Sequence, residues 1–70
     1  MSFREAAANA AALKAFDEAL NRSGSPMQAR NVAVRTWLQH RPRADLREAA
    51  ATVDELVDDA RDSASAPLWT

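Results

Sequence analysis

Apolar residues recur every three or four positions along three stretches of this chain, the spacing that places them on one face of an α-helix. At about residues 3–21 the predicted inward face consists of Phe3, Ala6, Ala10, Leu13, Phe16 and Leu20. At residues 26–40 it consists of Met27, Val34, Trp37 and Leu38. At about residues 46–61 the stripe is the most regular and consists of Leu46, Ala49, Ala50, Val53, Leu56, Val57 and Ala60.

Each predicted helix begins with a capping-box pattern, in which a small polar residue is followed three positions later by Glu or Gln. The three pairs are Ser2 and Glu5, Ser25 and Gln28, and Asp45 and Glu48. Gly24 suits the left-handed position after a helix end, and Pro26 suits a first helical position. Pro42 ends the second helix. Because the connections are short, we expect antiparallel neighbours and an all-α, up-down-up three-helix bundle over residues 1–62.

Residues 63–70 lack this periodicity and form a predicted C-terminal tail. Its first part, Ser63 to Pro67, is small and polar, as is typical of a spacer. Leu68 and Trp69 follow, and a tryptophan in such a tail either packs on the bundle or a second copy, or is bound by a partner protein. Both interpretations stay open at this point.

The composition predicts a thin core. Of the 70 residues, 47% are hydrophobic, but 17 of these residues are alanine and only 16 are large. The alanines of the first helix surround it, which permits close approach of another helix on more than one side. A bundle with so few large side chains gains stability by association. We therefore expect a homo-oligomer, a complex with another protein, or both.

Several classes of function are disfavoured. The chain has no cysteine, which excludes disulfides and thiolate chemistry and fits a reducing compartment. No stretch approaches the ~20 apolar residues of a membrane span, and no signal peptide is recognisable, so we expect a cytoplasmic protein. Catalytic and metal-binding motifs are missing from the sequence, and His40 is its only histidine. We expect no enzymatic activity, no cofactor and no metal. Abundant Ala, Arg and Asp with a single Lys favour a bacterial source.

Charge is segregated along the chain, although the net charge is only −1. Residues 30–47 carry a net charge of +4 and residues 48–70 a net charge of −5. The predicted acidic face consists of Glu55, Asp58, Asp59 and Asp62. This face either balances basic groups near the start of the second helix or binds a basic partner.

Basic residues gather at the opposite end of the third helix, and they are His40, Arg41, Arg43 and Arg47; Arg35 of the second helix is a further candidate for contact with an anion. A helix start with arginines around it attracts anions, so this region is the candidate for nucleic-acid phosphates. The third helix itself is too acidic to enter a DNA groove. We therefore favour a small protein-interaction or regulatory subunit that self-associates. The alternative is a nucleic-acid-associated regulator that binds through the second helix and the loop at residues 41–47.

Overall fold

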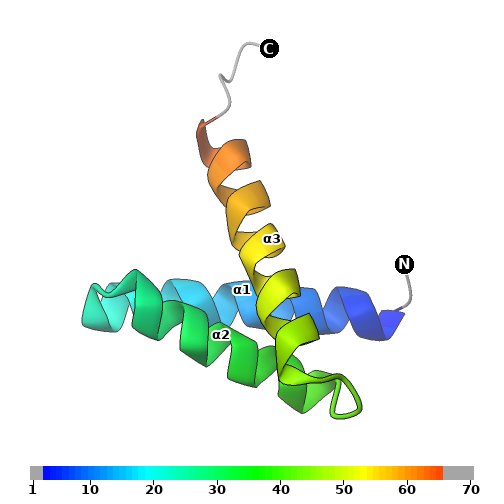
Figure 1. Ribbon diagram of the computed structural model, residues 1–70. Coiled ribbons are helices and arrows are strands. Elements are labelled where there is room, and N and C mark those ends of the chain that lie inside the picture. The colour runs from blue at the N-terminus through cyan, green and yellow to red at the C-terminus, as the bar shows by residue number, and fades with distance from the viewer. Residues whose placement is uncertain (1–2, 66–70) are drawn as a thin grey trace.

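The computed structural model describes the backbone of residues 3–65 and the side chains of residues 6–62. It contains three α-helices, α1 (Phe3–Ser23), α2 (Pro26–His40) and α3 (Leu46–Ser65). The predicted all-α three-helix bundle is confirmed, since residues 3–65 form helices that pack on one another and no strand occurs among them (Figure 1). The predictions made for Ser2, Leu68 and Trp69, and for the side chains of Phe3 and Glu5, lie outside the described residues.

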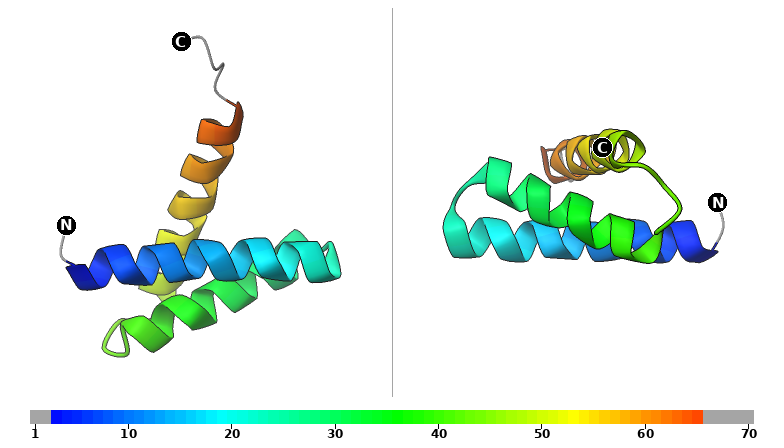
Figure 2. Two further views of the ribbon diagram at one scale, coloured as in Figure 1. Left: turned by 180° about the vertical axis from the view of Figure 1, so that it is seen from behind. Right: turned by 60° about the horizontal axis from the view of Figure 1, so that its bottom comes forward.

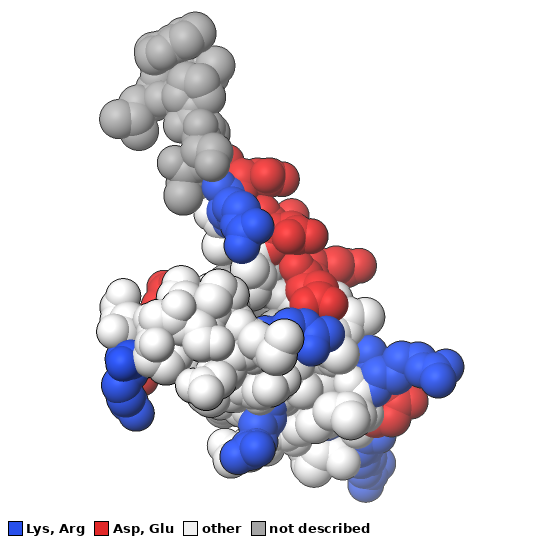
Figure 3. Space-filling model, turned by 60° about the vertical axis from the view of Figure 1, so that its left-hand side comes forward, with Lys and Arg blue, Asp and Glu red and all other residues white. Residues whose placement is uncertain are grey.

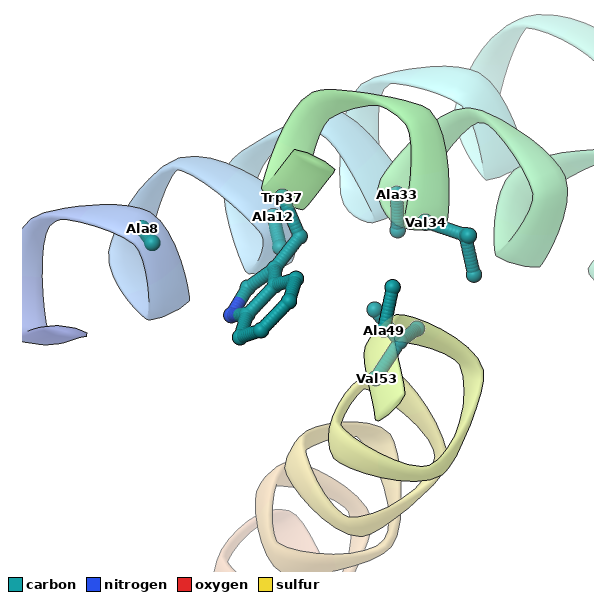
Figure 4. Packing of buried hydrophobic residues seen from close by; sticks show 7 residues of the cluster. All are labelled: Ala8, Ala12, Ala33, Val34, Trp37, Ala49 and Val53. Carbon is teal, nitrogen blue, oxygen red and sulfur yellow. The ribbon is translucent and has the colours of Figure 1, made fainter. Parts of the chain in front are cut away.

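The three helices do not all run alongside one another. α1 and α2 form an antiparallel hairpin, and α3 crosses this hairpin steeply (Figures 1 and 2). The first half of α3 packs on the hairpin, and the second half projects beyond it (Figure 1). The distance between two packed helices depends on the side chains at their contact, and small side chains allow a close approach. Ala33 of α2 and Ala49 of α3 are both buried there (Figure 4).

The turn between α1 and α2 has the predicted chemistry. Gly24 has a φ of 70°, and its N–H donates to the carbonyl of Leu20 over 2.8 Å. The Ser25 hydroxyl accepts the backbone N–H of Gln28 over 3.3 Å. The N–H of Ser25 itself donates to the hydroxyl of Ser23 over 3.2 Å. The cap is therefore confirmed, with Ser23 filling the role that a capping box gives to the Gln28 side chain.

The helix ends agree with the sequence pattern, except that two helices run further. α2 has the predicted bounds, α1 ends two residues later than predicted, and α3 ends at Ser65 rather than near residue 61. The segment 63–65, assigned to the spacer, is thus helical. Alanine favours a helix, serine tolerates one, and Pro67 is the first residue that opposes its continuation.

The described core is made mainly of alanine around one tryptophan. Its buried members are Ala8, Ala12, Ala29, Ala33, Val34, Trp37, Ala49 and Val53. Trp37 is only 3% exposed and lies between the hairpin and α3 (Figure 4). The predicted inward positions Ala6 and Ala10 are exposed. α1 instead turns its other alanine ridge toward α2, because small side chains let the two helices approach closely.

Two large residues predicted to face inward are exposed. Met27 is 74% exposed, because it lies in the first turn of α2, on the same side as the buried Val34 but two turns nearer the start of the helix. Leu46 is 67% exposed, because it starts α3 beside the loop, where only α2 lies near it. Both predictions were wrong for the same reason: the periodicity gives the face of a helix but not how much of that face a neighbour covers.

Candidate interaction site

An apolar groove lies between α1 and the projecting half of α3. Along α3, Val53 is buried, Leu56 and Val57 are half-buried, and Ala60 is exposed. The groove has a volume of about 350 Å³. We call it the α1/α3 groove, and its lining residues are Leu13, Phe16, Asp17, Leu20, Pro26, Val57, Ala60 and Arg61.

The groove exists because α3 is longer than the surface that it crosses. A helix of 20 residues is about 30 Å long, whereas two adjacent helices offer a width of about 20 Å. The apolar stripe of α3 therefore continues past the hairpin with no helix beneath it. On the opposite wall, Leu13, Phe16 and Leu20 of α1 are only half-buried, although the sequence placed them in the core. The apolar faces on both walls of the groove are therefore only partly covered.

The two walls of the groove carry opposite charges. Asp17 lies on the α1 wall and Arg61 on the α3 wall, and both side chains are exposed. Neither forms a hydrogen bond or an ion pair with any described residue. The sequence pattern does not predict that these two residues share a groove, because their proximity depends on the angle at which α3 crosses the hairpin.

A cross-helix ion pair borders the groove region and joins α2 to α3. The guanidinium of Arg30 donates to the carboxylate of Asp54 through two bonds, Nε to Oδ1 over 2.6 Å and Nη2 to Oδ2 over 3.1 Å. The hydrogen bond from Arg30 is the main cause that lowers the pKa of Asp54; desolvation opposes this shift, and the positive charge of Arg30 adds a smaller lowering. The side chains are 40% and 54% exposed, so the pair is screened by water.

The acidic face predicted on α3 is exposed. Figure 3 shows carboxylates along one side of α3, and the four predicted residues lie opposite the apolar stripe. Within the described part of the chain these four residues form no ion pair; they are Glu55, Asp58, Asp59 and Asp62. The balancing contact with Arg30 is made by Asp54, which the sequence analysis had not placed in the acidic face.

The predicted basic region is spread over α2, the loop and the start of α3. His40, Arg43 and Arg47 are exposed, whereas the guanidinium carbon of Arg41 lies over the Trp37 ring, 5.7 Å from its centroid. At the start of α3, Oδ1 of Asp45 accepts the backbone N–H of Glu48 over 2.7 Å, as predicted. An anion at this helix start would therefore compete with Asp45.

Arg35 lines a second groove, between α2 and α3. This groove has a volume of about 400 Å³ and is lined by Arg30, Asn31, Val34, Arg35, Leu38, Leu46 and Ala50. Arg35 was predicted as an anion contact on the second helix, and the groove that it lines was not predicted. The only sequence signal for it is Leu46, an apolar residue at the very start of a helix.

Among the described residues, no group of three or more His, Asp or Glu side chains is arranged to hold a metal ion. The described helices are too short or too polar to cross a membrane. Comparison with models of protein families, with curated proteins and with solved structures gave no match.

Proposed function

We propose that this protein is a small helical protein-interaction or regulatory subunit with no catalysis of its own, and that it associates with a second copy of itself through the α1/α3 groove. One observation carries the proposal: the apolar stripe of α3 extends beyond the hairpin and faces a second apolar surface on α1. A cytoplasmic, bacterial setting is part of the same proposal and rests on the composition.

The energetics support a reversible contact. Burying a Leu, Val or Phe completely is worth about 1.5–3 kcal/mol, so a half-buried one has about 1 kcal/mol left to gain. Four such residues line the groove: Leu13, Phe16, Leu20 and Val57. A symmetric contact between two copies doubles this gain. Much of it offsets the entropy lost on association, which favours a concentration-dependent dimer over a permanent one.

A protein partner is favoured over a nucleic acid. Asp45 occupies the start of α3, and Arg41 lies over Trp37. Arg43 and Arg47 are exposed, and neither of them lines the groove that contains Arg35. Phosphate binding needs several cations in register with one backbone, and this arrangement provides few.

Mass in solution across a dilution series tests the proposal. We expect the mass of the wild-type protein to fall from that of a dimer to that of a monomer on dilution through the micromolar range, and its Tm to rise with concentration. Ala60→Glu places a charge in the groove and should give a monomer throughout. Ala51→Glu is the matched control, because Ala51 is also an exposed alanine of α3 but lies outside the groove.

Two outcomes would contradict the proposal. One is a wild-type protein that stays monomeric, with a Tm independent of concentration. The other is equal disruption by Ala60→Glu and Ala51→Glu, which would show that any added charge on α3 prevents association. A different result would favour the nucleic-acid alternative: both the wild type and Ala60→Glu bind a DNA duplex, and their affinity for it falls steeply as the salt concentration rises.

A further inference from the structure

We propose that the α1/α3 groove of one copy receives the projecting half of α3 from a second copy, so that two copies exchange these arms about a two-fold axis. The arm is defined as residues 54–65 (Figure 1). This inference rests on the proposed self-association and specifies which surfaces meet. It also assigns Asp17 and Arg61 to ion pairs between the two copies.

The arm has the apolar surface that the groove requires. Leu56, Val57 and Ala60 form an incompletely covered ridge on one side of the arm. Laid against Leu13 and Phe16 of a second copy, this ridge covers apolar surface on both molecules at once. The carboxylates of the acidic face lie on the other side of the arm (Figure 3) and therefore remain in water. Docking the arm thus avoids the cost of burying unpaired charges.

The charged residues on the walls of the α1/α3 groove also favour the arm of a second copy as its occupant. Asp17 and Arg61 line the same groove in one copy, yet they do not pair with each other or with another described residue. In a two-fold contact each residue that contacts the partner does so twice, once from each copy. Arg61 follows Ala60 on the incoming arm, and Asp17 follows Phe16 on the receiving wall. Arm exchange therefore brings two Asp17–Arg61 pairs together across the interface.

The test is a charge exchange between two variants, Asp17→Arg and Arg61→Asp. Each variant alone places two like-charge pairs in the interface, so its dissociation constant should rise about tenfold or more above that of the wild type. An equimolar mixture should form a heterodimer with near wild-type affinity. In that heterodimer one pair consists of the two introduced residues and the other of the native Arg61 and the native Asp17. Native mass spectrometry separates the two homodimers and the heterodimer by mass.

The matched control is the pair Glu18→Arg and Arg47→Asp. It introduces the same charge changes on α1 and α3 at exposed positions outside the groove. Both variants should dimerise like the wild type, and mixing them should not favour the heterodimer. This control separates a specific contact from general attraction between proteins of unlike net charge.

The proposal is overturned if Asp17→Arg and Arg61→Asp each dimerise like the wild type, or if their mixture recovers no more affinity than the control mixture. If either occurs while Ala60→Glu still abolishes dimerisation, self-association through the groove stands and only arm exchange is wrong. A wild-type protein that is monomeric at every concentration overturns both proposals.

Discussion

The indole N–H of Trp37 donates a hydrogen bond to Oδ1 of Asn9 over 3.0 Å, and this bond joins α2 to α1 inside the hairpin. A buried tryptophan needs a partner for its one polar atom, and Asn9 is half-buried between the alanines of α1. Among the described residues, no buried side-chain nitrogen or oxygen atom is left without a hydrogen-bond partner. Because the alanines around Trp37 allow helices to slide along one another, this polar contact fixes their relative position.

We expect Asn9→Ala to destabilise the protein by about 1–3 kcal/mol, because it leaves the buried indole N–H unpaired. Urea unfolding followed by circular dichroism measures the loss. Asn21→Ala is the control, since Asn21 is an exposed residue of the same helix. Its effect should stay within about 0.5 kcal/mol. Equal effects of the two substitutions would show that the bond to Trp37 contributes nothing specific.

The N-caps of α2 and α3 should both stabilise the fold, and to different degrees. Removing an N-cap side chain costs about 0.5–2 kcal/mol. Asp45 makes a shorter and charge-assisted bond, 2.7 Å against 3.3 Å for Ser25. We therefore expect Asp45→Ala to lower the Tm more than Ser25→Ala does. Thermal unfolding at one fixed protein concentration checks the order, and the reverse order would contradict the geometry.

The Arg30–Asp54 pair should make stability depend on pH in the acidic range. The pKa of Asp54 is lower in the folded protein than in the unfolded chain, so the stabilisation is fully present above the ordinary aspartate value of about 3.9. It is lost as the pH falls through the lowered folded-state pKa. Asp54→Asn should therefore destabilise the protein at pH 7 and have almost no effect in strong acid. For so exposed a pair the effect at pH 7 is about 0.2–1 kcal/mol.

Asp58→Asn serves as the control for that comparison, because Asp58 is an exposed carboxylate of the same helix with no ion pair among the described residues. Its substitution should leave stability at pH 7 unchanged or slightly increased, since α3 then carries less negative charge near its C-terminal end. A pH-independent effect of Asp54→Asn would mean that the carboxylate acts through packing or helix propensity instead of its charge.

The helix starts were predictable from the sequence because capping is local. Ser25 and Asp45 act on backbone groups three residues away, so their pattern is readable without knowledge of the tertiary structure. The buried face of α1 was not predictable. Alanines occupy so many positions that the choice between Ala6 and Ala8 depends on which side approaches α2.

The candidate site was harder to predict than the fold, because it too depends on how the helices pack on one another. The sequence showed the full apolar stripe of α3 but not where the hairpin stops covering it. That limit is set by the steep crossing at Ala33 and Ala49, a tertiary property. The same crossing places Asp17 and Arg61 in one groove although they are far apart in sequence. Their charges could be counted from the sequence, but their proximity could not.

The role of Leu68 and Trp69 lies outside the described residues and is a prediction from sequence. We expect Trp69 to pack on the bundle or on a second copy, because an exposed tryptophan in a soluble protein promotes aggregation. Trp37→Phe leaves Trp69 as the only tryptophan. Its fluorescence should then be blue-shifted from that of indole in water and partly protected from an aqueous quencher.

Deletion of residues 66–70 provides the second measurement, with Trp37 kept in place. Because α3 ends at Ser65, this deletion removes the tail without shortening the helix. If the tail packs as expected, the deletion costs about 2–3 kcal/mol, the value of burying one Leu and part of one Trp. Unchanged stability, together with water-like emission from Trp69, would contradict packing. Binding to a separate partner protein would then be the remaining interpretation of Leu68 and Trp69.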